Sequence, residues 1–201
     1  MKEKYDIEYI DSAHLYLCNG AIIPSVTQIL EHIFPNKYKD IPEGILNAKA
    51  EYGTKLHNAI EKYNQDYSLE GYEDLDYIGK LSFEQYLRIK EENRINVKSQ
   101  EEIVNYKDYY AGRFDMLGFI KDELCLMDIK TTAKLDEEYL SWQLSLYEYA
   151  YIDMGGEEFN HLYAIWLPKK DIGQLVEVKR KSKEEIINLL KEIRGEGNVL
   201  R

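Results

Sequence analysis

Short apolar runs separated by turn signals open the chain, and helical spacing follows them. Asn19-Gly20 is a dipeptide typical of a two-residue hairpin turn. Ser25 suits a helix N-cap, and Gln28 three residues later completes a capping box. The pattern predicts strands over 5–10, 14–17 and 21–23, helices from residue 25, over 43–64 and over 75–91, and a loop over 70–76.

The second half of the chain begins with consecutive strand-like runs. They cover 95–106, 110–120 and 123–130, and Lys121-Asp122 leaves only a short turn between the last two. A helix over 136–154, strands over 159–167 and 173–180, and a helix from Ser182 to about 194 complete the prediction.

This order of elements predicts an α+β fold, with a mixed central β-sheet flanked by helices. At 201 residues the chain fits one domain. We expect a single domain over 1–201, with a helical N-terminal part over about 25–92 and a catalytic α/β core over about 93–194.

Composition limits the classes of function. The net charge of −11 opposes nucleic-acid binding, although charge can be segregated and metal-binding carboxylates contribute to it. Cys18 and Cys125 cannot supply an iron–sulfur cluster, and we expect two buried free thiols. No apolar signal region or membrane-length run is present, which indicates a soluble, cytoplasmic protein with no membrane partner.

The candidate chemistry centres on a pair of strands. Asp128 and Lys130 share one strand face, while Ile129 faces the core and leaves its carbonyl near the site. If strands 110–120 and 123–130 pair, Asp115 lies close to Asp128. Two carboxylates and a carbonyl suit one or two Mg²⁺ or Mn²⁺ ions, and Lys130 would position an attacking water. The alternative is an exposed strand face, because a lone Asp-x-Lys is common.

Polar and aromatic residues follow this pair. Gln143 and Tyr147 are four residues apart, so one helix face presents both. Tyr109, Tyr110 and Tyr139 could stack on nucleobases, with packing in the sheet as the alternative.

Three motifs together resemble a known family in their order and spacing. They are Gly112-Arg113-Phe114-Asp115, Asp128-Ile129-Lys130-Thr131-Thr132 and Gln143-Leu144-Ser145-Leu146-Tyr147. The chain resembles the PD-(D/E)XK nuclease superfamily, and more specifically its RecB-type exonuclease branch, often met as stand-alone phage or prophage enzymes. Residues 24–30 and 53–57 also look like that branch, so the resemblance spans about 21–151.

The resemblance implies a role for each matching residue. Asp115 and Asp128 would be metal ligands and Lys130 the catalytic lysine, with no iron–sulfur cluster. Gln143 and Tyr147 would contact DNA or support that lysine. The resemblance also implies that His57 is a metal ligand. Without the resemblance, the sequence predicts a histidine on the helix surface. The family tends to carry a further glutamate on the preceding strand, and Glu101 and Glu102 compete for that position.

The resemblance also implies a restriction-endonuclease-like core and a Mg²⁺- or Mn²⁺-dependent DNA exonuclease. Such an enzyme would act on free DNA ends in recombination, repair or phage replication, with a recombination or replication protein as a further partner. Two alternatives stay open at this stage: an endonuclease of the same superfamily, and an inactive module that binds nucleic acid or protein.

Overall fold

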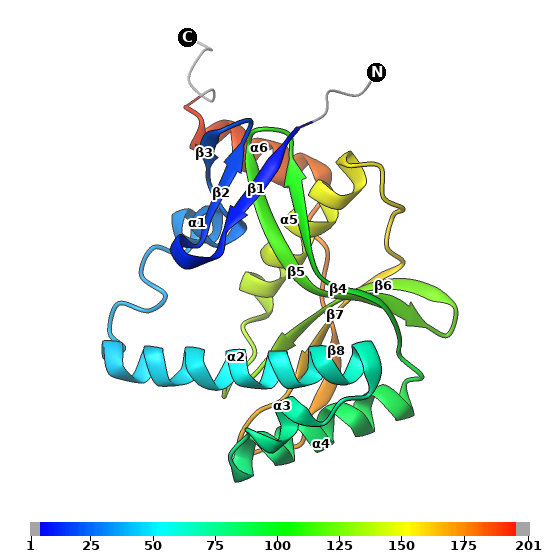
Figure 1. The fold of residues 1–201 in the computed structure, drawn as a ribbon. Helices are drawn as coiled ribbons and strands as arrows, with labels where there is room; N and C mark the ends of the chain where they lie inside the picture. Colours follow the sequence, from blue (N-terminus) through cyan, green and yellow to red (C-terminus); the bar gives the residue numbers. More distant parts are fainter. Residues whose placement is uncertain (1–4, 196–201) are drawn as a thin grey trace.

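Two β-sheets organise the molecule, which we describe from a computed structural model over residues 5–195 (Figure 1). The small sheet has strand order β1-β2-β3, all antiparallel: β1 (Ile7–Ile10), β2 (Leu15–Cys18) and β3 (Ala21–Ile23). The large sheet has strand order β4-β5-β6-β7-β8: β4 (Asn96–Tyr106), β5 (Tyr110–Ile120), β6 (Glu123–Lys130), β7 (His161–Trp166) and β8 (Gln174–Glu177). Only the β6–β7 pair is parallel, so the large sheet is mixed, as predicted.

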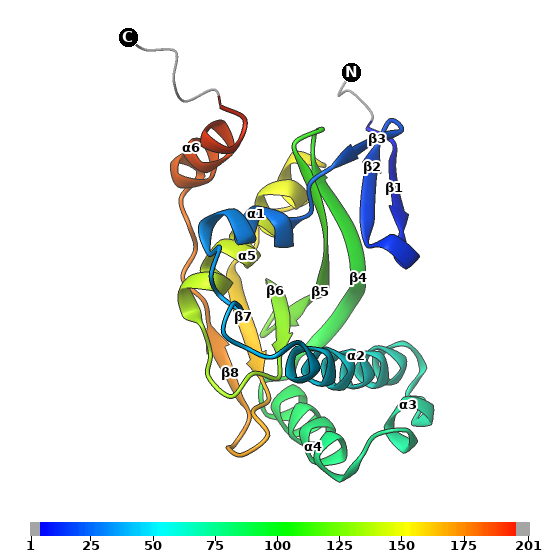
Figure 2. The same ribbon diagram turned by 90° about the vertical axis from the view of Figure 1, so that its left-hand side faces the viewer.

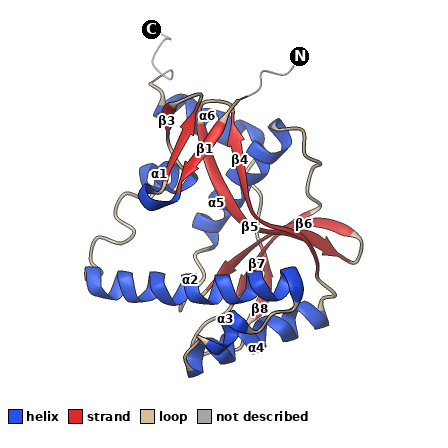
Figure 3. Cartoon of the chain, viewed as in Figure 1, coloured by secondary structure: helices blue, strands red, loops and turns tan. Residues whose placement is uncertain are grey.

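Helices lie on both faces of the large sheet (Figures 2 and 3). They are α1 (Val26–Ile33), α2 (Glu43–Asp66), α3 (Glu70–Glu73), α4 (Tyr77–Glu92), α5 (Glu137–Asp153) and α6 (Lys183–Ile193). One hydrophobic core joins α1, α5 and α6 to one sheet face, and a second joins α2 and α4 to the other. The predicted α+β class, with helices flanking a mixed sheet, is therefore confirmed. The predicted limits of the domain, which include residues 1–4 and 196–201 outside the described part, stay a prediction.

Turn and cap chemistry explains why the elements fall where the sequence predicts them. Asn19 and Gly20 both have positive φ, as a two-residue hairpin turn of the primed type requires. Lys121 and Asp122, between β5 and β6, also have positive φ. At α1, the Ser25 side chain accepts from the backbone N–H of Gln28, which completes the predicted capping box.

Side-chain alternation breaks in the middle of β5. Phe114 belongs to the core under α5, whereas Met116, two residues later, belongs to the core under α2. Residues two apart in a regular strand face the same way, so the strand changes face at Asp115. The neighbouring strand β4 is irregular as well, because its register with β5 shifts between Val97 and Ser99.

The structure corrects the prediction for residues 70–73 and confirms the one for the two cysteines. Residues 70–73, predicted as loop, form the one-turn helix α3. Cys18 and Cys125 are buried free thiols, as expected. Among the described residues, no helix has the length and apolar character needed to span a membrane.

Candidate metal centre and active site

The β5–β6 hairpin brings the two predicted aspartates together. Met116 pairs with Met127, so the ladder carries Asp115 towards Asp128 on the adjacent strand. The Asp115 Oδ2 atom accepts a hydrogen bond of 2.7 Å from the backbone N–H of Ile129. Asp115 is thus tied to the strand that carries Asp128, as the sequence predicted.

Asp128 and Lys130 form a tight ion pair. The Lys130 Nζ atom lies 2.5 Å from Asp128 Oδ2, and Asp128 is only 2% exposed. That oxygen makes no well-directed hydrogen bond with any described residue, so the contact is mainly electrostatic. Burial raises the pKa of Asp128 to about 6, with Lys130 opposing and Asp115 adding to the rise. Burial alone would lower the pKa of Lys130, but the two carboxylates raise it above its ordinary value.

Three potential metal ligands converge beside this pair. His57 from α2, Glu101 from β4 and Asp115 from β5 place one ligand atom each within 4.8 Å of one another. Asp128, predicted as a ligand, is not in this group and lies next to it, engaged with Lys130. The structure also separates the two candidate glutamates: Glu101 is in the group, and Glu102 is paired in register with Phe114.

Glu101 adopts a backbone conformation that is uncommon for its residue type. Its φ is 51°, in the left-handed region, although it stands inside β4. Glutamate in this region carries backbone strain, which tends to accumulate at functional sites. The strained conformation coincides with the placement of the Glu101 carboxylate among the potential ligands.

The Glu101 carboxylate lies near both a cation, Arg113, and an anion, Asp115. Arg113 Nε lies 2.8 Å from Glu101 Oε2. Burial and the nearby Asp115 charge nevertheless raise the pKa of Glu101 to about 7, against the attraction of Arg113. Without a further cation, the ionised form of Glu101 is therefore unfavourable, because the carboxylate is partly buried and lies near the negative charge of Asp115.

His57 shows how a cation fits this group. Its Nε2 atom lies 3.2 Å from the carbonyl oxygen of Ile129, which can only accept, so Nε2 carries the proton. In the neutral ring, Nδ1 then directs a lone pair towards Asp115 Oδ2, 3.6 Å away. Two facing lone pairs suit a cation between them, and this donor set fits Mn²⁺ or Mg²⁺. The carbonyl of Ile129, also predicted as a ligand, borders the group through the His57 contact.

The two predicted residues of α5 are buried and face the same region. Tyr147 packs so closely on β5 that a Cβ added to Gly112 would lie 2.6 Å from its ring. Burial, and then the charges of Asp128 and Asp115, raise the pKa of Tyr147 well above its ordinary value. Gln143 is 9% exposed, and its Oε1 atom has no hydrogen-bond partner among the described residues.

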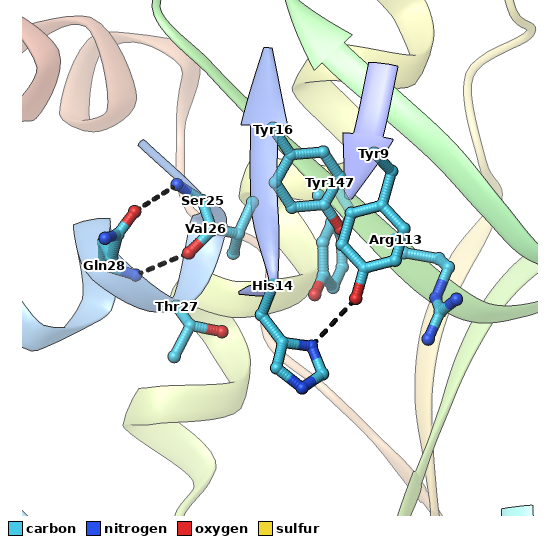
Figure 4. A pocket seen from close by; sticks show the side chains of 10 residues that line it. Tyr9, His14, Tyr16, Ser25, Val26, Thr27, Gln28, Arg113 and Tyr147 are labelled. Carbon is cyan, nitrogen blue, oxygen red and sulfur yellow. Dashed lines mark hydrogen bonds between the residues drawn. The ribbon is translucent and has the colours of Figure 1, made fainter. Parts of the chain in front are cut away.

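A cavity of about 410 Å³ adjoins the acidic group on the side of Arg113. Figure 4 shows Tyr9, His14 and Tyr16 of the small-sheet region facing Tyr147 and the start of α1. Its lining residues are Tyr9, His14, Tyr16, Ser25, Val26, Thr27, Gln28, Gly112, Arg113 and Tyr147. Arg113 links this cavity to the ligand group, because it pairs with Glu101 and lies over the Tyr9 ring at 5.2 Å.

Arg113 was not predicted as a site residue, although it belongs to the Gly112–Asp115 motif. The available signal was its position two residues before Asp115, where a cation could pair with a nearby carboxylate. Of the two alternatives for Tyr110, the structure supports packing in the sheet and not stacking on nucleobases. Its ring is fully buried, and its hydroxyl donates to the carbonyl of Leu146.

Comparisons with known proteins add little to this geometry. No family model and no curated protein matches the chain. Sixteen chains of solved structures match it. One is described as the crystal structure of SSO0001, with 15% identity, a TM-score of 0.37, and coverage of 74% of this chain and 75% of that chain. A likeness this distant carries no argument about chemistry.

Proposed function

We propose that the chain is a metal-dependent deoxyribonuclease, and specifically a DNA exonuclease of the RecB-type branch of the PD-(D/E)XK superfamily. The observation that carries the proposal is the convergence of His57, Glu101 and Asp115 within 4.8 Å, beside the buried Asp128–Lys130 pair. These residues come from one helix and three strands, so chance proximity along the sequence does not explain the group.

Each residue of the group has a part in the proposed reaction. His57, Glu101 and Asp115 would hold Mg²⁺ or Mn²⁺, and Asp128 would be a further ligand. When bound, such an ion lowers the pKa of water and stabilises charge on a phosphate. Lys130 keeps its proton next to Asp128, which lets it orient a water and offset developing negative charge.

The acidic composition does not oppose this assignment as strongly as the net charge suggests. Part of the charge of −11 comes from the carboxylates of the site, which a divalent cation would neutralise. The site itself contributes Arg113 and Lys130 as cations next to the acidic group. DNA ends are the proposed substrate, because the resemblance is to the RecB-type exonuclease branch. A recombination or replication protein is the proposed further partner.

Hydrolysis of end-labelled linear DNA in Mg²⁺, Mn²⁺ or EDTA tests the proposal. We expect cleavage with metal, none in EDTA, and a loss of at least about a hundredfold for Asp115→Asn. Glu102→Gln is the matched control, because it neutralises the adjacent carboxylate outside the ligand group. Full activity in EDTA or in Asp115→Asn would refute the metal-dependent mechanism.

Closed circular DNA separates the proposed exonuclease from its alternatives. Linear duplex should be degraded to short products while the same DNA as a covalently closed circle resists. Discrete fragments from the circle would favour the endonuclease. DNA binding without hydrolysis in either metal would favour an inactive binding module.

A further inference from the structure

A network of polar side chains joins α2, α4 and β4 beside the ligand group. Gln100 of β4 belongs to it and directly precedes Glu101. The Gln100 Nε2 atom donates to the carbonyl oxygen of Glu61 at 3.2 Å, and its Oε1 atom accepts from Asn64 Nδ2 at 2.6 Å. Both partners belong to α2, the helix that carries His57. Gln100 therefore links β4 to the helix that supplies another potential metal ligand.

The donors and acceptors of this network fix the orientation of the Gln100 amide. The Asn64 Oδ1 atom accepts from the Tyr86 hydroxyl at 2.8 Å and from the ammonium of Lys90. An ammonium only donates, so the Asn64 oxygen faces α4 and its Nδ2 atom faces Gln100. A carbonyl only accepts, so the Gln100 amide nitrogen faces Glu61. Since Tyr86 is fully buried, one end of the network is held in the hydrophobic core.

A regular strand cannot direct both Gln100 and Glu101 towards α2, because neighbouring residues of a strand point to opposite faces of the sheet. Gln100 nevertheless reaches Glu61 and Asn64, and Glu101 reaches the group that contains His57. The left-handed backbone of Glu101, with a φ of 51°, breaks the alternation at this point. A strained conformation of this kind persists only where the surrounding structure holds it.

Three restraints hold the strained residue. Arg113 Nε pairs with the Glu101 carboxylate at 2.8 Å. The register of β4 with β5 places residue 101 level with Asp115, because Gln100 pairs with Met116. The two hydrogen bonds of Gln100 to α2 hold the backbone immediately before Glu101. Of the three, the bonds of Gln100 are the ones that relate β4 to the helix of the histidine ligand.

We propose that Gln100 is a positioning residue for the metal centre, an inference that rests on the metal-dependent function proposed above. Its hydrogen bonds to α2 hold β4 in the conformation that turns the Glu101 carboxylate towards His57 and Asp115. Gln100 thus acts through Glu101, whose carboxylate is the ligand. Loss of a residue that orients a metal ligand typically weakens metal binding about 10- to 100-fold.

Mn²⁺ binding to Gln100→Met, measured by electron paramagnetic resonance at pH 8, tests the proposal. Methionine is similar to glutamine in length but lacks the amide that makes both hydrogen bonds to α2. We expect binding about tenfold weaker than in the wild type. Gln100→Ala, which introduces no new side chain to pack, is the second variant and should weaken binding to the same extent. Gln65→Met is the matched control and should bind as the wild type does, because Gln65 is exposed on α2 and donates to the Glu61 side chain rather than to β4.

A double variant separates positioning from a general loss of structure. Glu101→Ala removes the carboxylate through which Gln100 acts. Adding Gln100→Met to Glu101→Ala should therefore change the Mn²⁺ affinity by less than about twofold. A further tenfold loss would overturn the proposal, because Gln100 would then act independently of Glu101. Equal affinity in the wild type and in Gln100→Met would overturn it as well.

Crystal structures of the metal-free wild type and Gln100→Met separate this inference from the proposed function. In the variant we expect Glu101 to leave the left-handed region and its carboxylate to move away from Asp115. An unchanged Glu101 in the variant would overturn the positioning role, whether or not the wild type binds metal. If the wild type binds no Mn²⁺ but Glu101 moves in the variant, the metal-dependent function fails and Gln100 still positions Glu101.

Discussion

Replacing Glu101 with glutamine should stabilise the metal-free protein at neutral and alkaline pH. In the folded protein the pKa of Glu101 is about 7, against an ordinary value of 4.5. Between these two values the folded protein binds more protons than the unfolded chain, so its stability falls as pH rises through this window. Glutamine is neutral at every pH and can still accept from Arg113, so Glu101→Gln removes this loss.

The size of the effect follows from the same two values. A difference of roughly 2.5 pH units sets an upper limit of about 3 kcal/mol at full ionisation, with the attraction of Arg113 already included, and solvent screening of this partly exposed carboxyl reduces it to about 1–2 kcal/mol. For a chain of this length, that is a rise of about 2–8 °C in melting temperature. At about pH 4.5, where the carboxyl of the folded protein is protonated, the two proteins should differ little.

Thermal unfolding in EDTA at pH 4.5, 6 and 8 measures this difference. Glu102→Gln is the control, because it changes the same charge one residue along β4, outside the ligand group. Adding Mn²⁺ at pH 8 should reverse the order, since the wild type gains binding free energy that the variant has lost. A constant difference between wild type and Glu101→Gln across the pH range would refute the reasoning.

Three further substitutions test other parts of the account. His57→Ala should raise the Mn²⁺ concentration needed for hydrolysis at least about tenfold, and an unchanged metal titration would return His57 to a surface role. Ser25→Ala should cost about 1 kcal/mol of unfolding free energy through loss of the α1 cap, and a urea titration that finds no loss would contradict the role of the capping box. Gly118→Ala should cost roughly 1–3 kcal/mol or more, because its Cβ would lie 2.4 Å from the Asn96 carbonyl oxygen; an unchanged urea midpoint would show that β4 can move away.

Much of the fold could be predicted because local chemistry and tertiary packing agree. The β5–β6 hairpin spans the predicted residues, since apolar runs flank a short turn and no other element competes for them. The helix α3 was missed because its four residues form a single turn with acidic side chains and no apolar stripe. A helix that short depends on its neighbours rather than on its own sequence.

The site was harder to predict at the positions where the backbone departs from regular structure. Strict alternation cannot choose between Glu101 and Glu102, because β5 changes face at Asp115 and Glu101 itself has a positive φ. Neither feature has a signal in the sequence, since glutamate does not favour that conformation. Asp128 is buried, so its negative charge needs a nearby cation. Lys130, two residues away on the same strand face, supplies that cation by forming an ion pair with it.

Mn²⁺ binding, measured by the loss of the free-ion electron paramagnetic resonance signal, tests the central claim most directly. The wild type should bind Mn²⁺ at pH 8, and Asp115→Asn should bind at least about tenfold more weakly. Glu102→Gln should bind as the wild type does, because its carboxylate is outside the group formed by His57, Glu101 and Asp115. Equal affinity in the wild type and Asp115→Asn, or no binding in the wild type, would contradict the assignment of this group as the metal centre.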